Sequence, residues 1–132
     1  MESTLLTRLQ VVLIAEDDPG SLMALAVCLG LEGYETLQAT DGEAALAQYD
    51  ERGGQVDFVI TDFHLPDCNG MELIAELRWQ GSTVPMLIVT AALVDETALV
   101  QQGVSVVMSK PLDMKAVLAW LRGGRCRDSS RS

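Results

Sequence analysis

Short apolar runs alternate with amphipathic segments five times along the chain. The runs VVLIA (11–15) and PMLIVT (85–90) are almost wholly apolar, as expected for strands that are buried on both faces of a parallel sheet. The segments between the runs repeat apolar residues at helical spacing, as Leu22, Leu25 and Leu29 do. The pattern predicts strands over 11–15, 34–39, 57–61, 85–90 and 104–108, and helices over 21–32, 42–52, 71–79, 94–102 and 113–122.

Strands that alternate with helices favour parallel pairing through right-handed crossovers, which predicts a doubly wound α/β sandwich. A length of 132 residues suits one domain, which we place at residues 10–122. Residues 1–9 are interpreted as an N-terminal extension or linker. Residues 123–132 are rich in Gly, Ser and Arg and are expected to form a disordered tail.

Charge and composition exclude several classes of function. The net charge is −10, and residues 1–121 hold eighteen acidic and five basic groups. A surface this acidic repels a phosphate backbone, so direct binding of nucleic acid is not expected. No apolar run approaches the roughly 20 residues that span a bilayer, and no signal peptide is evident, so we expect a cytoplasmic protein without membrane contact. Cys28, Cys68 and Cys126 are widely spaced and are expected to be reduced thiols.

Polar residues follow the predicted strands at the sheet edge where α/β proteins bind ligands. Glu16 and Asp17 follow the first strand, Asp62 the third, Thr90 ends the fourth, and Lys110 follows the fifth. Crowded carboxylates repel one another unless a hard cation such as Mg²⁺ lies among them. A carboxylate is also a nucleophile towards phosphorus, and phosphoryl transfer depends mainly on positioning and charge neutralisation.

Each of these residues also has a plain structural interpretation. An acidic run after a strand is often a solvated loop or a helix cap, Thr90 fits an ordinary strand position, and Lys110 fits a surface position. The coincidence of all of them at the ends of four strands favours a site. The sequence therefore predicts a phosphoryl-accepting, magnesium-binding edge of the sheet.

Four motifs in order resemble the response-regulator receiver domains of two-component signal transduction. They are EDDP (16–19), DFVITDFHLPDCNG (57–70), LIVTA (87–91) and SKP (109–111). The resemblance covers about residues 10–122 and implies a flavodoxin-like, five-stranded parallel sheet with strand order 2-1-3-4-5. The wording of the second motif and the Lys-Pro-Leu sequence are similar to receivers appended to hybrid histidine kinases.

The resemblance implies a role for each residue at the sheet edge. Asp62 is the phospho-acceptor, and Thr90 and Lys110 contact the phosphoryl oxygens. The Lys110–Pro111 peptide bond is expected to be cis. Mg²⁺, for which Mn²⁺ is expected to substitute, is the implied cofactor, and its implied ligands are Glu16, Asp17, Asp62 and the backbone carbonyl of His64.

The resemblance implies that five residues switch or modulate the output: Thr90, Ala91, Ala92, Val107 and Pro111. The sequence departs from the pattern of receiver domains in three respects. Val107 stands where receivers usually carry the aromatic switch residue, and the stretch 90–110 is about two residues short, which predicts a shortened or irregular helix there. Ala92 replaces a residue that is often polar. Because His64 and Ala92 flank the path of a hydrolytic water, we expect a phosphoryl group that is lost slowly.

The implied function is signalling rather than enzymatic turnover, since the domain would catalyse only its own phosphorylation and dephosphorylation. The expected partners are a histidine kinase or histidine phosphotransfer protein and a downstream effector. Two alternatives remain: a pseudo-receiver that binds partners without phosphorylation, and an aspartate-nucleophile phosphatase of the haloacid-dehalogenase type. The phosphatase is less favoured because it would need a second aspartate where His64 stands.

Overall fold

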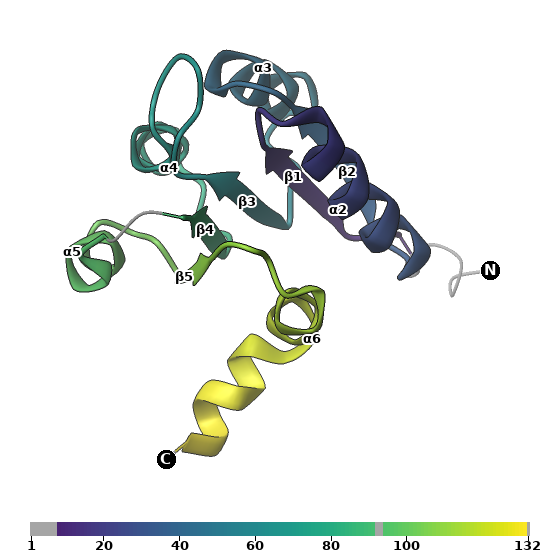
Figure 1. The fold of residues 1–132 in the computed structure, drawn as a ribbon, viewed down its shortest axis with the longest axis vertical. Coiled ribbons are helices and arrows are strands. Elements are labelled where there is room, and N and C mark those ends of the chain that lie inside the picture. The colour runs from purple at the N-terminus through teal and green to yellow at the C-terminus, as the bar shows by residue number, and fades with distance from the viewer. Residues whose placement is uncertain (1–7, 92–93, 132) are drawn as a thin grey trace.

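A computed structural model describes residues 8–91 and 94–131, with side chains up to residue 123. Its centre is a five-stranded, all-parallel sheet in the order β2-β1-β3-β4-β5, which confirms the predicted fold class and strand order (Figure 1). The strands are β1 (Val11–Ala15), β2 (Glu35–Ala39), β3 (Phe58–Asp62), β4 (Met86–Thr90) and β5 (Val106–Ser109).

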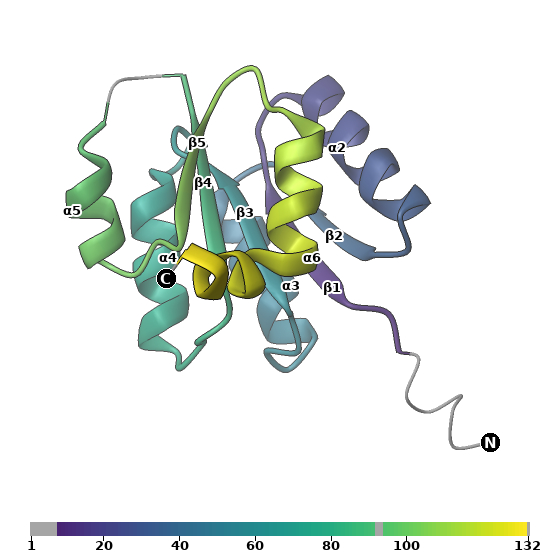
Figure 2. The same ribbon diagram turned by 90° about the horizontal axis from the view of Figure 1, so that it is seen from below.

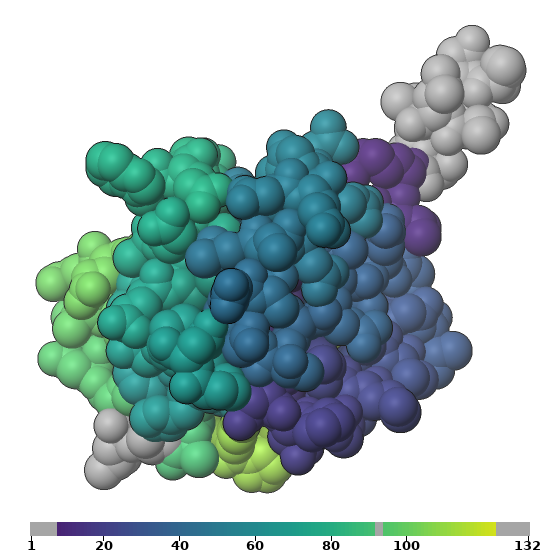
Figure 3. Space-filling model, turned by 90° about the horizontal axis from the view of Figure 1, so that it is seen from above, coloured from purple at the N-terminus to yellow at the C-terminus, as the bar shows by residue number. Residues whose placement is uncertain are grey.

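Helices cover both faces of the sheet. They are α2 (Pro19–Leu31), α3 (Gly42–Glu51), α4 (Gly70–Trp79), α5 (Glu96–Gln101) and α6 (Met114–Arg131). Helices α3, α4 and α5 lie on one face, and α2 and α6 lie on the other (Figures 1 and 2). On the first face α3 and α4 are neighbours, in blue and teal in Figure 3. Within the described residues, no helix is both long and apolar enough to cross a membrane.

Two apolar cores explain why the central strands are continuously apolar. Every residue of β1, β3 and β4 is buried, because the side chains alternate between the two faces and helices cover both. Leu13 of β1 packs with Ile74 of α4 in one core, whereas Ile14 packs with Leu29 of α2 in the other. In the second core the rings of Phe58 and Trp120 meet edge to face, with centroids 5.5 Å apart.

Side chains at the start of each helix accept the backbone N–H groups that have no partner within the helix. The predicted cap Asp41 accepts the N–H of Ala44 at 2.7 Å. Asn69 forms a capping box with Glu72 at the start of α4. These caps fix the points at which the loops from the carboxyl ends of the strands enter the helices.

The structure moves several predicted boundaries. Strand β3 runs to Asp62, whereas the sequence pattern ended it at residue 61, because Asp62 still pairs with Val89 of β4. Strand β5 begins at Val106, and Val104 is buried in the preceding turn, so its apolar character reflects burial rather than strand pairing. Helix α5 has only six residues, which confirms the prediction of a shortened helix.

The last helix breaks where the domain was expected to end. Gly123 has non-helical backbone angles (φ −158°, ψ 26°), and helix continues beyond it to Arg131. The part of α6 before the break runs from Met114 to residue 122, which agrees with the predicted helix over 113–122. The sequence predicted a disordered tail over 123–132, whereas the structure continues as helix to Arg131. The division of the chain into an extension, a domain and a tail stays a prediction.

Arg78 joins the end of α4 to the loop that follows it and to the turn after α5. Its guanidinium donates to the carbonyl oxygens of Ser82 at 3.2 Å, Val84 at 2.8 Å and Gly103 at 2.6 Å. Burial lowers the pKa of this arginine, and the three carbonyls compensate its lost hydration. The end of α4, the entry to β4 and the turn after α5 are therefore fixed to one another.

Replacing Arg78 by alanine leaves these carbonyl groups without a donor. We expect the Arg78→Ala variant to lose about 2 kcal/mol of unfolding free energy, measured by urea denaturation. Arg52→Ala is the matched control, because Arg52 pairs with the exposed Glu35 on the surface, and it should cost clearly less. Equal losses in the two variants would show that the contacts of Arg78 contribute no more than a surface ion pair.

Candidate functional site

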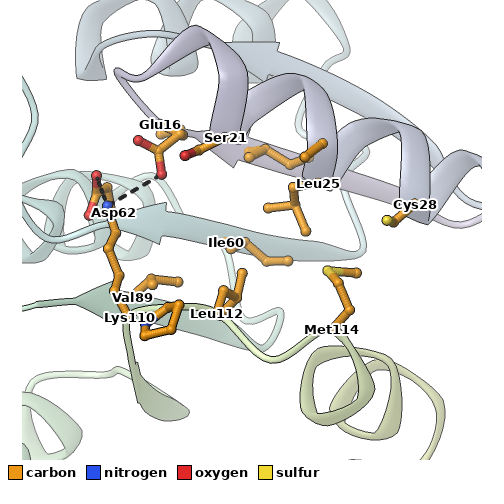
Figure 4. Close-up of a pocket in the computed structure, with 14 residues that line it drawn as sticks. Glu16, Ser21, Leu25, Cys28, Ile60, Asp62, Val89, Lys110, Leu112 and Met114 are labelled. Carbon is orange, nitrogen blue, oxygen red and sulfur yellow. Dashed lines mark hydrogen bonds and ion pairs between the residues drawn. The ribbon is translucent and has the colours of Figure 1, made fainter.

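The predicted polar residues meet at the carboxyl edge of the sheet. Asp62 ends the central strand β3, which lies between β1 and β4. The Nζ of Lys110, in the loop after β5, lies 2.9 Å from Asp62 Oδ2 and 3.6 Å from Glu16 Oε1. Figure 4 shows the lysine side chain reaching across to both carboxylates. One ammonium group therefore joins Asp62, which lies 48 positions earlier in the chain, to Glu16, which directly follows β1.

Three carboxylates gather around this contact. Oxygen atoms of Glu16, Asp17 and Asp62 all lie within 4.8 Å of one another. Glu16 and Asp62 are 8% and 6% exposed, whereas Asp17 faces solvent. The donor set is all oxygen and carries three negative charges against one ammonium, which fits a hard divalent cation such as Mg²⁺ with water completing its shell. These residues are the ones that would hold it.

Burial and charge shift the pKa values in this cluster. Burial raises the pKa of Glu16, and the charge of Asp62 adds to it, although the N–H of Asp18 and the charge of Lys110 oppose the change. Burial alone would lower the pKa of Lys110, but its hydrogen bond with Asp62 and the charges of Asp62 and Glu16 outweigh burial and raise it. The lysine therefore stays charged beside the carboxylates.

The other predicted residues take the following positions. Thr90 is buried at the end of β4, and its carbonyl accepts the N–H of Lys110 at 3.0 Å. Val107 is half-buried in β5 opposite Ile88, and Ala91 is exposed. The Lys110–Pro111 peptide bond is cis, which confirms that expectation.

His64 lies on the loop that follows Asp62, and its ring is exposed. The ring packs edge to face on Phe63, with centroids 5.0 Å apart, while its backbone pairs with Asn69. Ala92, the other residue expected to affect the lifetime of the phosphoryl group, lies outside the described residues. Of the described thiols, Cys28 and Cys68 are free, and burial and nearby carboxylates raise the pKa of Cys68 to about 11.

A pocket of about 270 Å³ opens beside the carboxylates, between α2 and the segment that enters α6. Glu16, Asp62 and Lys110 line one end of it, and apolar side chains such as Leu25 and Met114 line the rest (Figure 4). The Asp62 carboxylate is thus next to open space on the side of α2. A chemical group brought from outside has room to approach Asp62 there.

Sequence reasoning missed the role of Asp67. Its carboxylate accepts the N–H groups of Gly42 and Glu43, both at 2.9 Å, in the first turn of α3. These two hydrogen bonds hold the pKa of Asp67 below its usual range. A carboxylate in a loop and a glycine after a predicted cap are too common in sequences to have indicated this contact across 25 residues.

The strand order and the groups at the strand ends define a CheY-like α/β domain. The chain belongs to the response regulator receiver domain family, whose model matches residues 12–122. A solved receiver domain protein (CheY-like) from Methanospirillum hungatei superposes with a TM-score of 0.82 at 22% identity, covering 95% of this chain and 100% of that one. That likeness supports the fold.

Two curated regulators are similar in sequence. The transcriptional regulatory protein GlrR of Escherichia coli is 35% identical over 108 residues, which is 80% of this chain and 24% of that protein. The sensory transduction protein RegX3 of Mycobacterium tuberculosis is 35% identical over 113 residues, covering 84% of this chain and 48% of that protein. The chain thus spans between about a quarter and a half of the length of these relatives.

The Asp67 contact gives a pH-dependent prediction. A carboxylate whose folded pKa is lowered contributes its full stability above the ordinary value of about 3.9, and the contribution is lost as the pH falls through that value and the folded one. We therefore expect Asp67→Ala to lower the midpoint temperature of thermal unfolding near neutral pH. The difference in midpoint between this variant and the wild type should narrow below about pH 4. Circular dichroism at a series of pH values measures this difference, and a difference of constant size contradicts the assignment.

Proposed function

We propose that this chain is a phospho-acceptor that takes a phosphoryl group from a phosphohistidine onto Asp62 and signals through altered binding of a partner. The observation that carries the proposal is the buried Asp62 carboxylate, hydrogen-bonded to the ammonium of Lys110 beside Glu16 and Asp17. It is supported by membership in the receiver domain family.

The transfer forms one bond and breaks one. An oxygen of the Asp62 carboxylate attacks phosphorus, and the P–N bond of the donor's phosphohistidine breaks with its electron pair returning to the imidazole nitrogen. Negative charge on the phosphoryl oxygens then needs neutralisation more than any covalent assistance. Lys110 already contacts Asp62 and supplies one positive charge, and Thr90 at the end of the neighbouring strand β4 would supply a hydroxyl donor.

A divalent cation fits the remaining charge. Glu16, Asp17 and Asp62, with the backbone carbonyl of His64, are proposed as its protein ligands. When bound, Mg²⁺ or Mn²⁺ would neutralise negative charge on the phosphoryl oxygens. The chain's own contribution is to hold the three carboxylates close together at the end of buried strands, which costs repulsion in the absence of a cation.

The route by which phosphorylation is sensed differs from the usual aromatic switch. Val107 offers no ring to rotate, and α5 has only one and a half turns or so. We therefore assign the change in partner binding to the loop between β4 and α5 and the surface around it. The proposed partners are a histidine kinase or phosphotransfer protein and an effector in the cytoplasm, without direct contact of this domain with nucleic acid.

Acetyl phosphate with Mg²⁺ tests the chemistry directly. We expect intact-protein mass spectrometry to show the gain of one phosphoryl group in the wild type, none in Asp62→Asn, and little when the metal is chelated. Lys110→Ala should retain the fold but be phosphorylated more slowly by an order of magnitude or more, since it loses a charge at the transferring group.

The alternatives give different outcomes in the same experiment. No mass gain in the wild type at saturating Mg²⁺ would favour a pseudo-receiver. Steady release of phosphate over many turnovers from small phosphate esters would instead favour a phosphatase.

The lifetime of the phosphoryl group tests the role of His64. The His64 ring is exposed and packs on Phe63, on the loop beside Asp62. Ala92 has only a methyl group, which cannot orient a water. We expect His64→Asn and Ala92→Glu each to speed the decay of the phosphoprotein several-fold, followed by loss of the added mass after removal of the donor. An unchanged decay rate in both variants would rule out this role.

A further inference from the structure

The loop between β3 and α4 is closed on itself. The N–H of Gly70 donates to the carbonyl of Phe63 at 2.6 Å, and the N–H of Leu65 donates to the carbonyl of Cys68 at 3.0 Å. His64 and Asn69 form a bridge between these two hydrogen bonds. The loop therefore forms a short hairpin that starts at Asp62 and carries the His64 carbonyl near its base, with Asp67 towards its tip.

The tip of this hairpin is bound to another helix. Each oxygen of Asp67 accepts one N–H, Oδ1 from Gly42 and Oδ2 from Glu43. These N–H groups belong to the first turn of α3, where no intrahelical acceptor exists and where the helix dipole favours a negative charge. Asp41 accepts the next free N–H, that of Ala44, but makes no hydrogen bond to the hairpin. Two aspartates thus cap the same helix, and only one of them anchors the loop.

Glycine is required for space at both contact points of the hairpin. A Cβ on Gly42 would lie 2.4 Å from the sulfur of Cys68, and a Cβ on Gly70 would lie 2.5 Å from the carbonyl oxygen of Asp62. Either atom would push the hairpin away from its neighbour. The hairpin is therefore packed tightly between the start of α3 and the end of β3. Helices α3 and α4, which flank it, lie side by side in Figure 3.

We propose that Asp67 is a positioning residue for the metal and phosphoryl site, because it anchors the hairpin that carries the His64 carbonyl and follows directly from Asp62. The inference rests on the proposed function, since it assumes that a divalent cation binds there. A loop that is already ordered loses less conformational entropy when a ligand binds to it. Releasing the tip of the hairpin should therefore weaken cation binding without removing any ligand.

Calorimetric titration with Mg²⁺ tests this role. We expect Asp67→Ala to raise the dissociation constant roughly tenfold, the size typical for loss of a group that orients metal ligands, and Asp67→Asn, which keeps one acceptor oxygen, to fall between it and the wild type. Asp41→Ala is the matched control: it removes one negative charge and one cap from the same helix and should leave the constant nearly unchanged.

A second pair of variants perturbs the same contact without touching a charge. Gly42→Ala should weaken Mg²⁺ binding because its Cβ displaces Cys68, whereas Gly30→Ala in α2, whose Cβ would meet nothing within 4 Å, should not. Hydrogen exchange of the amides of residues 64–69 should accelerate in Asp67→Ala and Gly42→Ala only.

The outcomes separate the two proposals. If the wild type fails to bind Mg²⁺, the proposed function is wrong. If the wild type binds and Asp67→Ala and Asp41→Ala shift the constant equally, Asp67 acts only through its charge and helix cap, and the positioning role is overturned while the proposed function stands.

Discussion

The site depends on the contact between one ammonium and two buried carboxylates. Lys110 lies 2.9 Å from Asp62 and 3.6 Å from Glu16, and Asp17 stands beside them, so a net negative charge remains at the ends of buried strands. Such a cluster is costly on its own, because burial and like charge both disfavour ionised carboxylates. Glu16 shows that cost as a raised pKa. A divalent cation bound as proposed would reduce this repulsion between the carboxylates.

The sheet order creates this contact. Strand β3 lies between β1 and β4, and β5 borders β4, so the carboxyl ends of four strands meet although their residues are far apart in the sequence. Burial of β1, β3 and β4 on both faces fixes their register, since a shift by one residue would exchange the two cores. The positions of Asp62 and Glu16 are therefore set by the packing of apolar residues in the two cores, such as Leu13 in one and Ile60 in the other.

The apolar runs were sufficient to predict the central strands, and the polar residues after them were sufficient to predict that Glu16, Asp62 and Lys110 meet at one edge of the sheet. The roles of these residues came from the resemblance and stay predictions. Both succeed because burial on two faces leaves an unambiguous pattern and because parallel strands end on the same edge. The boundary of β5 was wrong because Val104 is buried outside the strand. The contacts of Asp67 with α3 and of Arg78 with three carbonyls were not predictable, since each joins a common residue type to backbone groups whose proximity only the tertiary structure creates.

Under the proposed function, the residues around Asp62 limit how phosphorylation could be read out. Val107 is half-buried, apolar and paired within the sheet opposite Ile88, so it has no polar end that a new charge at Asp62 would attract or repel. Lys110 and Thr90 are different: the carbonyl of Thr90 accepts the N–H of Lys110, and the ammonium of Lys110 donates to the Asp62 carboxylate. A phosphoryl group adds close to two negative charges. Under the proposed function, the response to that charge would start in the two segments that follow β4 and β5, and Ala91 is exposed at the first of them.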